Sequence, residues 1–170
     1  MLDLKKLLDM QKELDKTILD NAGIKEYPLE NIKLALLVEL GELANEWKGF
    51  KHWKKHKDIN RDKLLEEFAD CLSFALSLEN ELHQAKKYGY EDLITIIEDV
   101  KKILVGYDLN AKEAMRMSAF ELAFSQVSNL KNVISNTLSV GIYLDLTFEE
   151  MEQAYLAKNK VNYERQNNGY

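Results

Sequence analysis

Apolar residues recur every three or four positions along most of the chain, which is the period of an amphipathic α-helix. The first such segment begins near Leu4 and is predicted to end at Asn21-Ala22-Gly23, because a glycine follows the last apolar position. Pro28 is predicted to open a second helix that ends near Phe50, since proline is favoured in a first helical turn. The first fifty or so residues are therefore predicted to form two helices.

A third helix is predicted from about Asp62 to about Leu82. Apolar residues lie on nearly every side of both the second and the third predicted helices, and a helix of that kind is buried by neighbours on more than one face. These two helices are therefore predicted to form the centre of the fold.

Helical spacing continues through the second half of the chain. A fourth helix is predicted over residues 91–104, followed by a turn at 106–108. Thr147 and Glu150 have the capping-box spacing, which predicts a last helix from Thr147 to around Arg165. An extended conformation is the alternative for residues 142–146, just before that helix. One long fifth helix is predicted to carry, on one face, Phe120, Ala123, Val127, Leu130, Ile134 and Leu138.

Composition narrows the class of protein. The chain has 170 residues, 46% of them hydrophobic, with one proline and seven glycines, which predicts a single all-α domain over residues 1–170, a bundle of five to six helices. The N-terminus lacks the apolar core of a signal peptide, and Cys71 is the only cysteine, so a cytoplasmic protein is expected. The net charge of −6 disfavours general binding to nucleic acid or to an anionic membrane.

Two pairs of acidic residues interrupt the most apolar parts of the second and third predicted helices. Glu39 and Glu42 form one pair, and Glu67 and Asp70 form the other. Residues at i and i+3 lie about 60° apart around a helix, so the two members of each pair share a face. A carboxylate in an apolar setting is costly unless it is paired or bound to a metal.

Local ion pairs do not account for these acids, because Lys33 is the only cation between Asn31 and Lys48. Oxygen-only ligands suit a hard divalent ion such as Mg²⁺. The sequence therefore predicts a buried four-carboxylate metal site between the second and third helices. The alternative is an exposed acidic stripe that Glu46 and Glu66 extend.

A basic segment with aromatic residues, 51–57, follows the helix that carries the first acidic pair. Lys54 is predicted to reach the oxygens of a polyphosphate, and Trp53 to pack on a base or sugar. An ordinary exposed loop is the alternative for most of its lysines. The chain has no glycine-rich phosphate loop, so phosphate contacts must come from side chains.

The C-terminal segment offers such side chains. Lys158, Asn162 and Arg165 follow one another at spacings of four and three, which places them on one helical face without an obvious acidic partner. This pattern predicts a phosphate-binding face. A polar helix end is the alternative interpretation.

Taken together, these motifs resemble the all-α dimeric dUTPases of the MazG-like nucleotide pyrophosphohydrolase group. The ExxE and ExxD pairs match the signature of the group, and Phe50-Lys51-His52-Trp53 suggests the dUTPase branch. The tail resembles the family pattern with Lys158, Asn162, Arg165-Gln166 and Gly169-Tyr170, and residues 10–15 resemble the segment whose glutamine helps to read uracil. The family often has a histidine where this chain has Ser73.

The resemblance implies an all-α homodimer that hydrolyses dUTP, and dUDP, to dUMP. It implies that the four acids hold about two or three Mg²⁺ ions, for which Mn²⁺ can substitute. It also implies that one of these acids, Glu39 or Glu42, accepts a proton from water. Lys158, Asn162, Arg165 and Tyr170 would contact phosphates, as would Lys54. Gln11 would read the uracil edge, with Trp53 and Phe74 shaping the base or sugar pocket.

Two other functions remain open from the sequence. One is a related pyrophosphohydrolase for another nucleotide, such as dCTP or a modified deoxynucleotide. The other is a helical partner-binding protein, such as a phage-encoded factor that sequesters a repressor.

Overall fold

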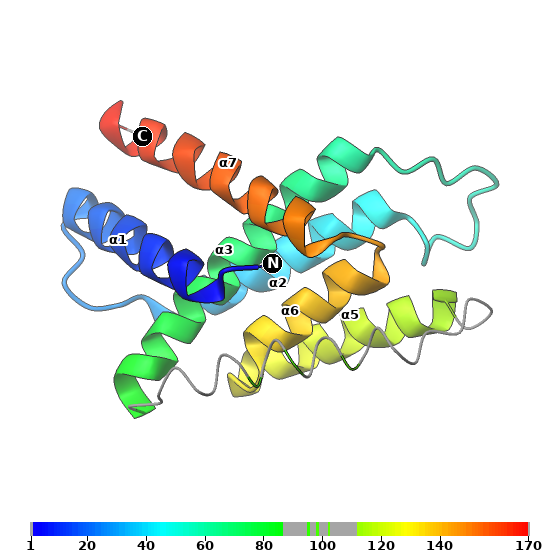
Figure 1. Ribbon diagram of the computed structural model, residues 1–170, viewed down its shortest axis with the longest axis horizontal. Coiled ribbons are helices and arrows are strands. Elements are labelled where there is room, and N and C mark those ends of the chain that lie inside the picture. Colours follow the sequence, from blue (N-terminus) through cyan, green and yellow to red (C-terminus); the bar gives the residue numbers. More distant parts are fainter. Residues whose placement is uncertain (1, 87–94, 96–97, 99–101, 103–111, 170) are drawn as a thin grey trace.

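A computed structural model describes residues 2–86, 95, 98, 102 and 112–169, and these residues form six α-helices and no strand (Figure 1). The all-α prediction is confirmed. The helix predicted over 91–104 and the turn at 106–108 lie outside the described residues. The helices are α1 (Leu4–Ala22), α2 (Leu29–Trp47), α3 (Arg61–Lys86), α5 (Lys112–Asn129), α6 (Val133–Tyr143) and α7 (Phe148–Asn167).

Helix α3 is the centre of the bundle. It contacts α1, α2, α6 and α7, and Figure 1 shows α1 and α7 on one side of it and α5 and α6 on the other. Its side chains Phe68, Leu72 and Leu76 are fully buried, as the sequence pattern predicts. Gly141 lets α6 approach closely, because a Cβ atom there would lie 2.6 Å from a ring carbon of Phe68. The second predicted central helix, α2, packs along α3.

Helix ends match the capping signals in the sequence. At the start of α1, the side chain of Asp3 accepts a hydrogen bond from the backbone N–H of Lys6 at 3.1 Å. The helix ends at Gly23, whose φ of 67° is a left-handed conformation that glycine adopts without strain. Pro28 directly precedes α2, and the capping box predicted at Thr147 and Glu150 is present.

The single long helix predicted through Leu130 is wrong. The chain forms two helices there, because Leu130 and Asn132 both have a φ of 50° and break the helical path between α5 and α6. The apolar face of α5 packs on α2 and that of α6 packs on α3, which one straight helix would not allow. Residues 142–146 are not extended either, since α6 runs to Tyr143 and is followed by a turn with Asp145 at a φ of 62°.

No helix within the described part of the chain is long and apolar enough to cross a membrane.

Glu150 joins the start of α7 to the start of α3, and its removal should destabilise the fold. Its carboxylate accepts a hydrogen bond from the backbone N–H of Thr147 at 2.8 Å and from the guanidinium of Arg61 at 2.7 Å. These bonds lower the pKa of Glu150 from 4.5 to about 2. We expect Glu150→Gln to lower the free energy of unfolding by about 1–2 kcal/mol in urea titrations at neutral pH.

The pH dependence of this difference has a defined sign. Because the pKa of Glu150 is lower in the folded state, its contribution is present above the unfolded value of about 4.5 and is lost as the pH falls towards 2. Glu149→Gln is the control, since Glu149 lies in the same helical turn but is exposed. Equal stability of the two variants at neutral pH would contradict the role of Glu150.

Candidate active site

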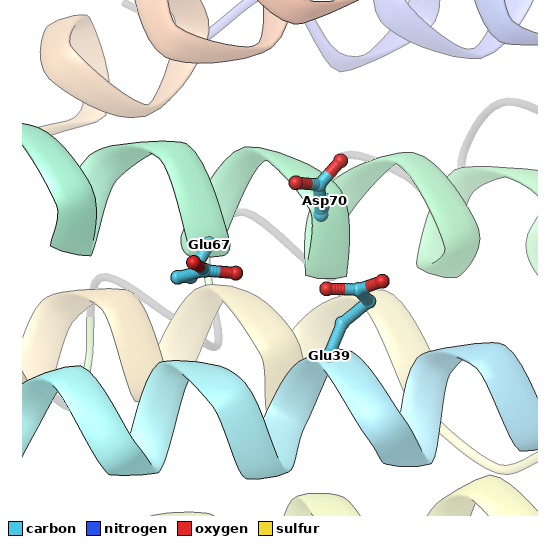
Figure 2. A group of neighbouring side chains, drawn as sticks. All are labelled: Glu39, Glu67 and Asp70. Carbon is cyan, nitrogen blue, oxygen red and sulfur yellow. The ribbon is translucent and has the colours of Figure 1, made fainter.

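Three carboxylates come together where α2 faces α3 (Figure 2). Glu39 extends from α2 towards α3, which carries Glu67 and Asp70. One oxygen of each lies within 4.8 Å of the other two, and all three side chains are partly buried. Fully buried leucines on either side of Glu39, Leu36 and Leu40, hold this part of α2 in the core.

Glu42, the fourth acid predicted for this site, lies one turn further along α2 and is exposed. It is not part of the group of three oxygens. Its charge is nevertheless close enough to raise the pKa of both Glu39 and Glu67. The structure thus brings three of the four predicted acids together and places Glu42 at the edge of the cluster.

The electrostatics of this cluster favour a cation. Burial, followed by the charges of Asp70, Glu42 and Glu67, raises the pKa of Glu39 from 4.5 to about 7. Burial and neighbouring acids also raise the pKa of Glu67, and burial raises that of Asp70. Carboxylates that repel one another in a partly buried site are stabilised by a shared positive charge. Because every donor atom is a carboxylate oxygen, the residues fit a hard divalent cation.

Helix α7 brings a positive side chain to these acids. The Lys158 ammonium donates a hydrogen bond to Asp70 Oδ2 at 2.6 Å and lies 3.8 Å from a carboxylate oxygen of Glu66. The expectation that Lys158 has no acidic partner is therefore wrong, because the partner belongs to a helix far away in the sequence. The positive charge of Arg165, further along α7, lowers the pKa of Asp70.

A cavity of about 440 Å³ joins these groups to the helix pair α1 and α7. Glu39, Asp70 and Lys158 line one part of it, and Asn162 and Arg165 extend that part along α7. Gln11, the glutamine predicted to read a base, lines another part together with residues of α1, α3 and the segment before α2. Other side chains that line the cavity include Leu14, Asp15, Tyr27, Pro28, Ser73, Phe74 and Ser77. One cavity therefore spans the acids, the phosphate-binding candidates and the predicted base-reading residue.

The amide of Gln11 is held by hydrogen bonds at both ends. Its Nε2 donates to Asp15 Oδ1 at 2.7 Å, and its Oε1 accepts from the Tyr155 hydroxyl at 3.1 Å. Ser77 also donates to Asp15 Oδ1, at 2.9 Å. Tyr155 is fully buried and accepts a hydrogen bond from Asn159 at 3.3 Å. This network gives the side chain of Gln11 a fixed position in the cavity wall.

Sequence reasoning did not find the partners of Gln11. Asp15 follows Gln11 by four residues and so shares its helical face, which was a usable signal. Ser77 and Tyr155 gave no comparable signal, because only the packing of distant segments brings them to the same place.

Trp53 and Lys54 do not line this cavity. The side chain of Trp53 is 64% exposed and packs edge-on against Phe50 and His52, and Lys54 is exposed. Phe74 does line the cavity, whereas Tyr170 lies outside the described residues.

Other lysines in and beside the basic segment form hydrogen bonds with the backbone of this part of the chain. Their ammonium groups donate to backbone carbonyl oxygens nearby, which supports the loop interpretation for them. The pairs are Lys48 with Asp58, Lys51 with Asn45, and Lys57 with Gly49.

Comparison with known proteins identifies a family for this chain. A family described as dUTPase matches the chain over residues 3–170, which is nearly its full length. No curated protein matches the chain.

Proposed function

The chain belongs to the dUTPase family and is a dUTP diphosphatase, and we propose that it hydrolyses dUTP, and dUDP, to dUMP with Mg²⁺ in the cavity between α1, α2, α3 and α7. The observation that carries this proposal is the cavity itself. Two of the clustered carboxylates, Glu39 and Asp70, line it together with the cationic face of α7 and the hydrogen-bonded Gln11. A nucleotide needs these three kinds of partner, for its metal-bound phosphates, its free phosphate oxygens and its base.

Glu39, Glu67 and Asp70 would hold the metal, with Glu42 contributing from the edge of the cluster. When bound, Mg²⁺ supplies positive charge that offsets the negative charge developing on the phosphate oxygens and makes water more acidic. Glu39 is the proposed proton acceptor for the attacking water. Glu39 lines the cavity beside Asp70, so a water molecule next to the bound cation would lie within reach of its carboxylate.

The side chains of α7 would bind the phosphates. Lys158 can exchange its bond with Asp70 for a bond with a phosphate oxygen, because both acceptors are anionic. Asn162 and Arg165 line the cavity beyond it, and the guanidinium of Arg165 can form two parallel hydrogen bonds with a phosphate. Phosphates bound there would place the base towards Gln11 and Phe74.

A nucleotide panel tests the function. We expect release of pyrophosphate from dUTP, and of phosphate from dUDP, only when Mg²⁺ is present, with Mn²⁺ as an active substitute. Turnover of dCTP and dTTP measured beside dUTP reports the selectivity of the base pocket. Hydrolysis of dCTP in preference to dUTP would contradict the proposal, as would hydrolysis of dUTP in a metal chelator.

We also propose that two copies of the chain form a homodimer. Leu34 and Val38 lie one turn apart on α2 and are 62% and 49% exposed, which is unusual for large apolar side chains on adjacent turns. We expect sedimentation equilibrium at micromolar concentration to give twice the monomer mass. A monomeric mass in an active sample would contradict the dimer.

A further inference from the structure

Lys158 lines two cavities. One is the cavity of the candidate active site, and the other is a space of about 580 Å³ between α3 and α7. Among the described residues, Lys158 is the only one that lines both. Since part of its surroundings is open space, this side chain can change position without displacing packed neighbours.

Two acids of α3 lie within ion-pair distance of the Lys158 ammonium. Asp70 Oδ2 accepts a hydrogen bond from its Nζ at 2.6 Å, and Glu66 Oε1 lies 3.8 Å from the same atom. Glu66 precedes Asp70 by four residues, so both lie on one face of α3, and α7 packs on this helix. A movement of about 1 Å would bring the ammonium within hydrogen-bond distance of Glu66.

Glu66 is close to the clustered acids but separate from them. It is not one of the three carboxylates whose oxygens lie within 4.8 Å of one another. Its side chain is 63% exposed and lines the second cavity, whereas that of Asp70 is 17% exposed and lines the active-site cavity. Burial is the main cause of the raised pKa of Asp70, and the charge of Glu66 adds to it.

A divalent cation on Asp70 would take the present partner of the Lys158 ammonium. The cation needs the carboxylate oxygens that the ammonium contacts, and the two positive charges repel each other. The Lys158 side chain is only 14% exposed, so an ammonium left without an acceptor would be costly. Of the acids that contact Lys158 in the described part of the chain, Glu66 is the one outside the cluster.

Resting on the proposed function, we propose that Glu66 is a positioning residue that accepts the Lys158 ammonium when a divalent cation occupies Asp70. Glu66 then keeps the ammonium beside the active-site cavity until a phosphate oxygen replaces the carboxylate. In this role Glu66 acts on the metal site through Lys158 and favours cation binding, because it lowers the cost of vacating Asp70. A Glu66 that instead held Lys158 on Asp70 would oppose cation binding.

The variant Glu66→Gln tests this assignment through the affinity for the metal alone. It keeps the shape of the side chain and removes its charge, and the fold should be retained because Glu66 is exposed. The nucleotide-free protein is titrated with Mn²⁺ by calorimetry at about 0.15 M salt, which screens exposed charges. We expect a dissociation constant about three- to tenfold higher than that of the parent. An unchanged or lower constant would overturn the proposal.

The same exchange in a Lys158→Met background shows whether Glu66 acts through Lys158. With no ammonium to accept, Glu66→Gln should change the dissociation constant for Mn²⁺ by less than about twofold. An equal loss of affinity in both backgrounds would mean that Glu66 acts on the metal directly, which overturns the proposal. Asp62→Asn is the matched control, since Asp62 is an exposed acid of the same helix that lines the same second cavity, and it should leave Mn²⁺ binding unchanged.

A crystal structure of the parent with Mn²⁺ and without nucleotide gives a second test that needs no variant. Lys158 Nζ should lie about 2.8 Å from a carboxylate oxygen of Glu66 and no longer contact Asp70. An ammonium that stays on Asp70, or that turns to solvent, would overturn the proposal. A parent that neither binds Mn²⁺ nor hydrolyses dUTP contradicts the proposed function, whereas a parent that does both without these effects of Glu66 overturns the inference alone.

Discussion

Exchange of Glu39 for glutamine should lower kcat for dUTP by roughly 10²–10⁴-fold, the range expected for loss of a general base. Glu39 is one of three carboxylates whose oxygens cluster within 4.8 Å, and it is the proposed proton acceptor. A glutamine amide has nearly the same shape but carries no charge and does not accept a proton at neutral pH. Binding of the divalent ion and activation of water should therefore both be impaired.

The same exchange should stabilise the metal-free protein at alkaline pH. The pKa of Glu39 is about 7 in the folded state against 4.5 for the free side chain, so the folded state binds the proton more tightly. Stability of the parent therefore falls as the pH rises from about 4.5 to about 7, and the cost remains above that window. Glutamine removes this cost, and the gain should disappear below about pH 4.5.

Thermal unfolding across this pH range, with and without Mg²⁺, measures both effects. Added Mg²⁺ should raise the Tm of the parent and change that of Glu39→Gln much less, because a ligand stabilises only the state that binds it. Glu30→Gln is the control, since Glu30 is an exposed carboxylate of the same helix. Full Mg²⁺-dependent turnover in Glu39→Gln would remove Glu39 from the site.

The helices follow from the sequence wherever a local signal marks their ends. Gly23 ends α1 and Thr147 begins α7 because each makes bonds that only neighbouring residues determine. The break between α5 and α6 has no such signal. Apolar spacing continues across it, and a leucine at a φ of 50° is adopted only because packing of both helices on the core outweighs the local strain.

The acidic cluster was predictable for a related reason. Carboxylates inside apolar helices need a partner, and this holds before the fold is known. The position of Glu42 was not predictable, because side chains about 60° apart on one helix need not both face the neighbouring helix. The packing of α2 on α3 decides that Glu39 faces inwards and that Glu42 is exposed.

The base end of the cavity shows where sequence reasoning stops. Gln11 was found through a family resemblance, but the residues that fix its orientation come from other elements. Tyr155 and Ser77 are far from Gln11 in the sequence, and only tertiary packing makes them neighbours. Their hydroxyl groups look like ordinary polar positions until the hydrogen bonds are known.

The positive charge of Lys158 should partly neutralise the clustered acids while no metal is bound. Its ammonium bonds to Asp70 at 2.6 Å, and its charge lowers the pKa of Glu39, Glu67 and Asp70. A divalent ion that binds these acids displaces or repels the ammonium, which then becomes available to a phosphate. Lys158 therefore opposes metal binding in the absence of nucleotide and assists substrate binding in its presence.

The variant Lys158→Met separates these two effects because it keeps most of the length of the unbranched side chain and removes the charge. Loss of a charged hydrogen bond to phosphate should lower kcat/KM for dUTP roughly ten- to hundredfold. Calorimetric titration of the nucleotide-free protein with Mn²⁺ should show tighter binding than in the parent. This titration belongs at roughly pH 8.5, where protons compete least with the metal for the acids.

Lys160→Met provides the control, since Lys160 lies on the exposed side of the same helix and should change neither value. A purely structural lysine would show a different pattern. Its loss would lower the Tm and leave Mn²⁺ affinity unchanged or weaker, because the acids would lose their arrangement. Parental kcat/KM in Lys158→Met would exclude a phosphate contact, and unchanged Mn²⁺ affinity would exclude competition between the ammonium and the metal.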